Sequence, residues 1–190
     1  MILLIDGRSG SGKTTFAARL HGVLGWPVVH LEDAYPGWTG LSAASDAVAD
    51  SMLDPEGAGF RRWDWHANDW AEWVDLSEFT APAPGRAGAE PSGPPAAAAS
   101  SHRGGGAPAR SLIIEGCGAL TADNLAAARA IGDGEAWGAW VELDEPTRFA
   151  RAMARDPYFR GHWRMWAAQE DAHIARHDPR SLADWTVRPR

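Results

Sequence analysis

The sequence opens with MILLIDGRSGSGKTT, residues 1–15, and this stretch decides the fold. Its first five residues form a short apolar run that ends at Asp6, which is typical of a buried strand. Residues 7–14 then match the pattern GxxxxGK[ST] at each fixed position, and apolar residues recur at helical spacing over residues 14–24. A strand, a glycine-rich turn and a helix in this order predict a phosphate-binding P-loop.

The chemistry of phosphate binding explains this spacing. Glycines let successive backbone N–H groups turn toward one anion, and the helix that follows directs the positive end of its dipole to the same point. Lys13 would contact the β- and γ-phosphates, and the Thr14 hydroxyl is suited to Mg²⁺. Lys13 is also the only lysine among 18 basic residues. The predicted ATP-binding residues of this loop are Gly7, Ser9, Gly10, Ser11, Gly12, Lys13, Thr14 and Thr15.

Composition limits the classes of protein to consider. A chain of 190 residues with 45% hydrophobic and 23% charged residues suits one globular domain, residues 1–190. The net charge of −7 argues against a nucleic-acid partner. No apolar stretch approaches the roughly 20 residues of a membrane span, and residues 1–15 lack the features of a secretory signal. We therefore expect a cytoplasmic protein with no membrane partner. The single cysteine, Cys117, excludes an internal disulfide and is interpreted as a small buried hydrophobe.

Strands and helices alternate along the rest of the chain. Such alternation predicts a three-layer α/β P-loop NTPase fold, with a five-stranded parallel sheet and a helical lid at about 148–165. Residues 81–110 are dominated by Pro, Gly, Ala and Ser, which predicts a flexible loop inside the single domain. Beyond residues 1–24, strands are predicted at 27–31, 111–115, 136–143 and 184–187, and helices at 41–53, 66–76, 121–131, from Pro146, and at 161–177.

Four segments resemble the uridine kinase-like branch of small-molecule kinases. They are residues 6–15, the EDAY of residues 32–35, the IEG of residues 114–116, and the RDPYFRG of residues 155–161, which fits the lid pattern RDxxxRG. A looser match is WDWH, residues 63–66, where the family has an aromatic-Asp substrate segment. The resemblance implies a kinase that uses ATP and Mg²⁺ to phosphorylate a hydroxyl of a nucleoside or a similar small molecule.

The resemblance also implies roles for the acids that follow two strands. Asp33 would deprotonate the acceptor hydroxyl and help to hold Mg²⁺, and Glu115 would complete the metal site. Both acids come at the carboxyl end of a predicted parallel strand, where such folds bind ligands. Glu32 is a rival of Asp33, because strand alternation lets only one of the two face the site.

Arginines cluster around the predicted lid. Arg148, Arg151 and Arg155 recur at i, i+3 and i+7 and so share one helix face. Arginines on a lid neutralise the charge that phosphoryl transfer spreads over the equatorial oxygens. We expect Arg151 to bind ATP and Arg155 and Arg160 to be catalytic, whereas Arg148 and Arg164 are interpreted as a solvated face.

Aromatic residues are the candidates for the acceptor side. Most of the 11 tryptophans are expected in the core. Trp163 and Trp166, three apart on a predicted helix, could line the lid side. The predicted substrate-binding residues are Tyr35, Trp63, Asp64 and His66.

Several alternatives stay open. The acceptor could be a nucleoside monophosphate, with Arg61 and Arg62 as its basic partners, or a sugar acid, or an antibiotic hydroxyl. A protein of another class, an ATP-binding regulator with little turnover, would also contain the P-loop. A GTPase of the usual type is disfavoured, because its NKxD motif needs a second lysine.

Overall fold

The computed structural model describes residues 1–80, 111–131 and 134–189. The loop predicted at 81–110 lies outside these residues. Within them, no helix is both long and apolar enough to cross a lipid bilayer.

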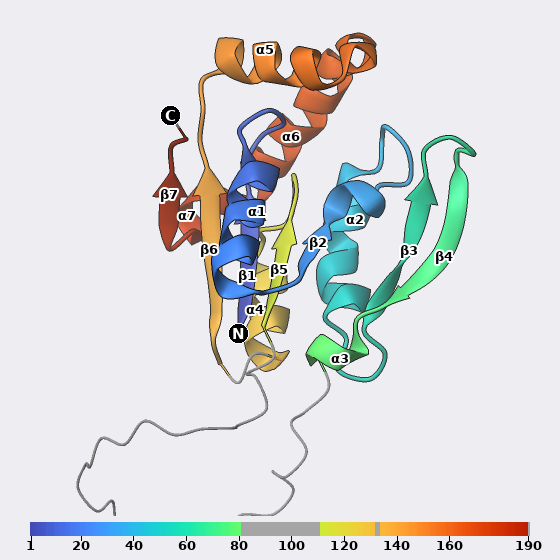
Figure 1. Ribbon diagram of the computed structural model, residues 1–190, viewed down its shortest axis with the longest axis vertical. Coiled ribbons are helices and arrows are strands. Elements are labelled where there is room, and N and C mark those ends of the chain that lie inside the picture. The colour runs from blue at the N-terminus through green and yellow to red at the C-terminus, as the bar shows by residue number, and fades with distance from the viewer. Residues whose placement is uncertain (81–110, 132–133, 190) are drawn as a thin grey trace, which may run out of the picture.

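A five-stranded parallel sheet forms the centre of the molecule, in the order β2-β5-β1-β6-β7 (Figure 1). The central strand β1 places Ile5 opposite Glu115 on one side and Ala139 on the other. All five predicted strands are present, which confirms the α/β fold class. Their bounds are β1 Ile2–Asp6, β2 Val28–His30, β5 Leu112–Glu115, β6 Ala136–Val141 and β7 Trp185–Val187.

Alternate side chains of β1 pack on opposite faces of the sheet. Ile2 and Leu4 belong to the larger core cluster, which includes Leu125 of α4 (Ala122–Ile131). Leu3 belongs to a second cluster with Ala17 of α1 (Lys13–Leu24). Figure 1 shows α1 in front of the sheet and α4 behind it, so the fold has three layers.

Helix α5 crosses above the carboxyl ends of the strands (Figure 1). It begins as the sequence predicts, with Pro146 in its first turn and the Asp144 carboxylate accepting from the Thr147 N–H at 3.0 Å. The remaining helices are η1 Leu31–Asp33, α2 Leu41–Ala47, its π-helical continuation η2 Val48–Met52, α3 Ser77–Thr80, α5 Glu145–Arg155, η3 Pro157–Gly161, α6 Trp163–His177 and α7 Pro179–Leu182.

The helix predicted over residues 66–76 is wrong. This segment contains β4 (Asp69–Asp75), which pairs antiparallel with β3 (Gly59–Asp64) in a hairpin beside the main domain (Figure 1). Trp70 and Trp73 have helical spacing, but Trp70 pairs across the hairpin with Trp63, with ring centroids 5.1 Å apart. Cross-strand packing therefore overrides the local pattern.

The turn of this hairpin is also encoded locally. The Asp64 carboxylate accepts from the N–H groups of His66 and Ala67 at 2.8 and 3.0 Å, and Asn68 adopts a φ of 54°. Asp and Asn are the residues that favour such turns. The turn positions His66 and Asn68 so that they line the cleft described below.

Candidate functional site

The P-loop is closely packed against neighbouring backbone. A Cβ atom at Gly7 would lie 2.4 Å from Val141 O, and one at Gly10 would lie 2.2 Å from Arg148 O. Gly10 also has a φ of 77°, which side chains rarely adopt. Glycine is therefore required at both positions for the loop to lie where it does.

Lys13, the first residue of α1, is 8% exposed. Its Nζ donates to Arg8 O at 3.2 Å and to Cys117 Sγ at 3.3 Å. Burial disfavours its charged form, but the negative charges of Glu115, Glu170 and Asp6 oppose burial, and the pKa of Lys13 is raised. The ammonium group is therefore charged at neutral pH.

Glu115 ends β5 beside the P-loop. Its Oε1 accepts from Thr14 Oγ1 at 2.9 Å and lies 2.6 Å from His30 Nδ1. Burial alone would raise the pKa of Glu115, but the His30 hydrogen bond, the Lys13 charge and the Thr14 hydroxyl lower it. An ionised carboxylate therefore lies next to a hydroxyl, and oxygen donors of this kind suit Mg²⁺. In the described part of the chain, no three His, Cys, Asp or Glu side chains cluster as a metal site.

Cys117 is buried, as the sequence predicts, but it is not an isolated hydrophobe. Its Sγ lies 3.6 Å from Ser9 Oγ and donates to Glu170 Oε1 at 3.4 Å. Burial raises the pKa of the thiol to about 12. The neutral thiol therefore acts as a polar link between Lys13 and helix α6.

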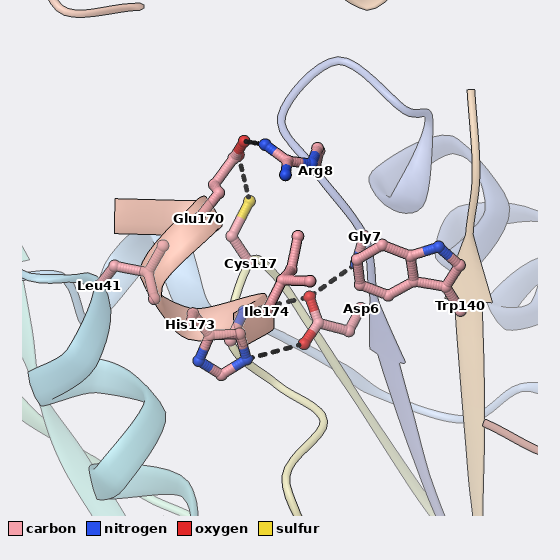
Figure 2. Close-up of a pocket in the computed structure, with 10 residues that line it drawn as sticks. Asp6, Gly7, Arg8, Leu41, Cys117, Trp140, Glu170, His173 and Ile174 are labelled. Carbon is pink, nitrogen blue, oxygen red and sulfur yellow. Dashed lines mark hydrogen bonds and ion pairs between the residues drawn. The ribbon is translucent and has the colours of Figure 1, made fainter. Parts of the chain in front are cut away.

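A small cavity of about 10 Å³, the size of one water, lies beneath the P-loop (Figure 2). The Asp6 carboxylate at its wall accepts from the N–H groups of Gly7, Gly118 and Leu120 at 2.6–3.1 Å. His173 Nε2 lies 3.6 Å from the same carboxylate. Asp6 thus holds the loops that follow β1 and β5 together.

A cleft of about 1490 Å³ opens between the P-loop, the hairpin turn and the segment of residues 145–177. This exceeds the roughly 300–1,000 Å³ of a pocket for one small molecule, so it has room for two ligands. Eleven predicted site residues line it: Ser9, Gly10, Gly12, Lys13, Thr14, Thr15, Tyr35, His66, Glu115, Arg151 and Arg155.

Six predicted site residues do not line this cleft: Gly7, Ser11, Asp33, Trp63, Asp64 and Arg160. Gly7 and Ser11 are buried within the P-loop itself. Asp64 caps the hairpin turn, and Trp63 packs edge-on against Trp70. Arg160 lies over the Phe149 ring, 5.3 Å from its centroid. Of the acid pair, Glu32 rather than Asp33 lines the cleft.

The sequence did not predict the aromatic wall of the cleft. The rings of Trp38 and His162 stack with centroids 4.0 Å apart, and Trp65 lies 5.1 Å from Trp38. Tyr158 also lines this wall. These residues come from three separate segments. Trp65 lies in WDWH and Tyr158 in RDPYFRG, but neither pattern predicts that they meet Trp38.

Trp166 lines the cleft as expected, whereas Trp163 packs in the core. Trp166 is 4% exposed, and its Nε1 has no hydrogen-bond partner among the residues that the structure describes. The indole N–H of a residue that lines the cleft therefore has an unmet hydrogen-bonding capacity.

The interpretation of Arg148 as solvated is wrong, while Arg164 is exposed as expected. Arg148 is 6% exposed and donates to Leu143 O at 3.2 Å and to Ser9 O at 3.1 Å. It faces the P-loop because α5 crosses directly above that loop.

Arg61 and Arg62 do not line the cleft. Arg61 donates to Ala71 O at 3.1 Å, and Arg62 pairs with Glu72 at 2.7 Å. Both side chains therefore stabilise the hairpin and do not border the acceptor side.

No protein-family model and no curated protein matches this sequence. Among solved structures, the chain is similar to a possible uridine kinase from Bacillus stearothermophilus, with a TM-score of 0.53 and 16% identity over 98% of this chain and 87% of the other. A shikimate kinase from Acinetobacter baumannii in complex with shikimate matches at a TM-score of 0.44 and 13% identity over 100% of this chain and 83% of the other. The chain thus shares its fold with a possible small-molecule kinase, and at this identity the likeness extends to the fold alone.

Proposed function

We propose that this protein is a kinase that transfers the γ-phosphoryl group of ATP to a hydroxyl of a small molecule, a nucleoside or a similar compound. One observation carries the proposal. The charged Lys13 and the Thr14–Glu115 pair border the same cleft as a separate aromatic wall, so a phosphate donor and an acceptor have adjoining places.

At the donor end, the P-loop amides and Lys13 would bind the β- and γ-phosphates. Arg151 approaches this loop, since a Cβ atom at Gly12 would lie 3.6 Å from Arg151 Nη1. Arg155 lines the cleft one turn further along the same helix. Both arginines would neutralise charge on the transferred group, and Arg160 would join them only if the segment moved.

Mg²⁺ would be held by the Thr14 hydroxyl and the Glu115 carboxylate, whose oxygen atoms fit its preference. When bound, the ion supplies positive charge that offsets the charge of the phosphates. Lys13 stays protonated beside these groups, so it donates to the phosphates throughout.

Glu32 is our first candidate for the general base that takes the proton of the acceptor hydroxyl, because its side chain lines the cleft. Asp33, the acid that the family resemblance favours, follows directly in η1 and is the second candidate. Only Glu32 lines the cleft, so the transfer rates of Glu32→Gln and Asp33→Asn variants distinguish the two candidate bases.

The acceptor is better described as uncharged than as a monophosphate. Arg61 and Arg62, the basic partners predicted for a monophosphate, are engaged within the hairpin. The wall instead offers the rings of Trp38 and Trp65 and the unpartnered N–H of Trp166. Tyr35 and His66 border the same space. A planar or apolar ring with a hydrogen-bond acceptor suits such a surface.

The test is incubation of the protein with Mg·ATP and a panel of nucleosides, nucleoside monophosphates, sugars, sugar acids and aminated sugars, followed by mass spectrometry. We expect a gain of one phosphate on an uncharged hydroxyl compound, and none with the Lys13→Ala variant. ATP binding with no product from any compound would contradict the kinase proposal and favour the regulator. A product from a monophosphate alone would contradict the assigned acceptor class.

A further inference from the structure

Ser9 in the P-loop is held on both sides by buried charged side chains. Its N–H donates to Glu170 Oε1 of α6 at 2.7 Å, and its carbonyl accepts from Arg148 Nη1 of α5 at 3.1 Å. Glu170 is 3% exposed and Arg148 is 6% exposed. Two different helices therefore hold the backbone of one P-loop residue.

Each charge has local compensation. Glu170 lies 3.6 Å from the Arg8 guanidinium, and Arg8 also contacts Asp171. Arg148 lies over the Trp163 ring, 5.5 Å from its centroid. Burial of charged groups is costly unless hydrogen bonds satisfy them, and a charged group bonds more strongly than a neutral one. These contacts are therefore strong and depend on geometry.

Glu170 is also connected to the phosphate-binding lysine. Figure 2 shows Glu170 reaching toward both Arg8 and Cys117. The Cys117 thiol in turn lies 3.3 Å from Lys13 Nζ. A substitution at Glu170 therefore alters the contacts of the loop backbone and, through Cys117, those of Lys13.

The phosphate-facing half of the loop is left free by this arrangement. The N–H groups of Gly12, Lys13 and Thr14 stand at the start of α1, where a helix has no internal partners for them. Ser9 and Gly10 are instead fixed against α5 and α6, with Gly10 in contact with the Arg148 backbone. The anchored half thus sets the direction of the amides in the other half.

We infer that Glu170 and Arg148 are positioning residues: through Ser9 they hold the P-loop in its anion-binding shape and couple it to helices α5 and α6. The effect on nucleotide affinity rests on the proposed function. The effect on the loop itself does not, because it concerns contacts within the protein.

Two measurements on the full chain test this inference. The first depends on nucleotide binding, and the second does not. Calorimetry with the non-hydrolysable analogue AMP-PNP and Mg²⁺ should show affinity about tenfold or more weaker for Glu170→Ala, through loss of a charged hydrogen bond. Glu170→Gln should recover most of it, since an amide oxygen still accepts from Ser9 N–H. The matched control, Asp171→Ala, removes a contact to Arg8 but none to Ser9 and should bind within about twofold of the wild type.

Amide hydrogen exchange of the free protein, read by mass spectrometry on peptides that cover residues 7–12, is the second measurement. Exchange should accelerate in Glu170→Ala and stay unchanged in Asp171→Ala. Unchanged exchange in a folded Glu170→Ala variant, or equal loss of affinity in the Ala and Gln variants, would overturn the inference. Absence of analogue binding by the wild type would contradict the proposed function instead. If Glu170→Ala does not fold, Arg148→Met against Arg148→Lys supplies the same comparison, because lysine keeps a donor for Ser9 O.

Discussion

The two ends of the cleft are built differently. At the phosphate end, Lys13, Thr14, Glu115 and Cys117 are joined by hydrogen bonds to one another or to nearby backbone. At the end proposed to bind the acceptor, aromatic rings pack on one another, and the buried N–H of Trp166 has no partner in the described part of the chain.

This difference indicates two kinds of recognition. Charged donors that are already fixed by the protein need no reorganisation when a phosphate arrives, which is the basis of electrostatic stabilisation of a transition state. An aromatic wall with an unpaired donor is completed only by its ligand. Substitutions at the phosphate end should therefore affect the transfer step, whereas those at the acceptor end should affect binding of one substrate.

The largest effect is expected for Lys13→Ala. Loss of this preorganised cation should lower turnover about a hundred- to a thousandfold. The rate of phosphate transfer to the acceptor that the panel identifies is the measurement, with Arg164→Ala as the control for removal of an exposed cation. Near-normal turnover in Lys13→Ala would contradict the claim that substitutions at the phosphate end affect the transfer step.

The next effect separates the two candidate bases. Glu32→Gln should lower the transfer rate about a hundredfold and leave the affinity for Mg·ATP unchanged, because Glu32 lines the cleft. Asp33→Asn should have a much smaller effect. The opposite ranking would show that Asp33, the acid that the family resemblance favours, takes the proton.

A smaller effect is expected at the acceptor end. Trp166→Phe keeps an aromatic side chain, although a smaller one, and removes the indole N–H, so the KM for the acceptor should rise about tenfold while the KM for ATP is unchanged. Trp63→Phe is a matched control, because its indole N–H is also unpartnered but the residue does not line the cleft. Equal effects of the two substitutions would contradict the assignment of Trp166.

The smallest effect is expected on thermal stability, from loss of the hydrogen bond between His30 and Glu115. The hydrogen bond to Glu115 raises the pKa of His30 against the effect of burial, and His30 in turn lowers the pKa of Glu115. The stability from His30 is present below its unfolded pKa of about 6.5 and is lost as pH rises through the raised value. That from Glu115 is present above its unfolded pKa of about 4.3 and is lost as pH falls through the lowered value.

The pair should thus stabilise the protein most between about pH 4.3 and 6.5. Thermal unfolding of wild type and His30→Gln should differ by a few degrees at pH 5.5, and the difference should shrink toward pH 9. A difference that grows with pH would contradict this assignment of the charges.

The phosphate end was predictable because its residues are contiguous. Backbone geometry fixes the spacing of the glycines, Lys13 and Thr14, so one short pattern predicted both the loop and the central strand. Glu115 could be predicted as well, since an acid that ends a buried strand needs a cation or donors nearby.

The acceptor end depends on contacts between distant segments, which no short pattern encodes. Trp38 and His162 are 124 residues apart in sequence (162 minus 38) yet stack at 4.0 Å. Residues 66–76, which contain β4, were predicted as a helix for the same reason, because the partner strand β3 decides the conformation of residues 69–75. Arg148 was misjudged because its burial comes from the position of α5 over the P-loop, which is a property of the tertiary fold.

Calorimetric titration of Mg·AMP-PNP into the wild-type protein tests the central claim most directly. The account predicts binding at one site per chain, and a loss of that binding in Lys13→Ala with no loss of folding. Absence of heat with a well-folded wild-type protein, or equal affinity in Lys13→Ala, would contradict it.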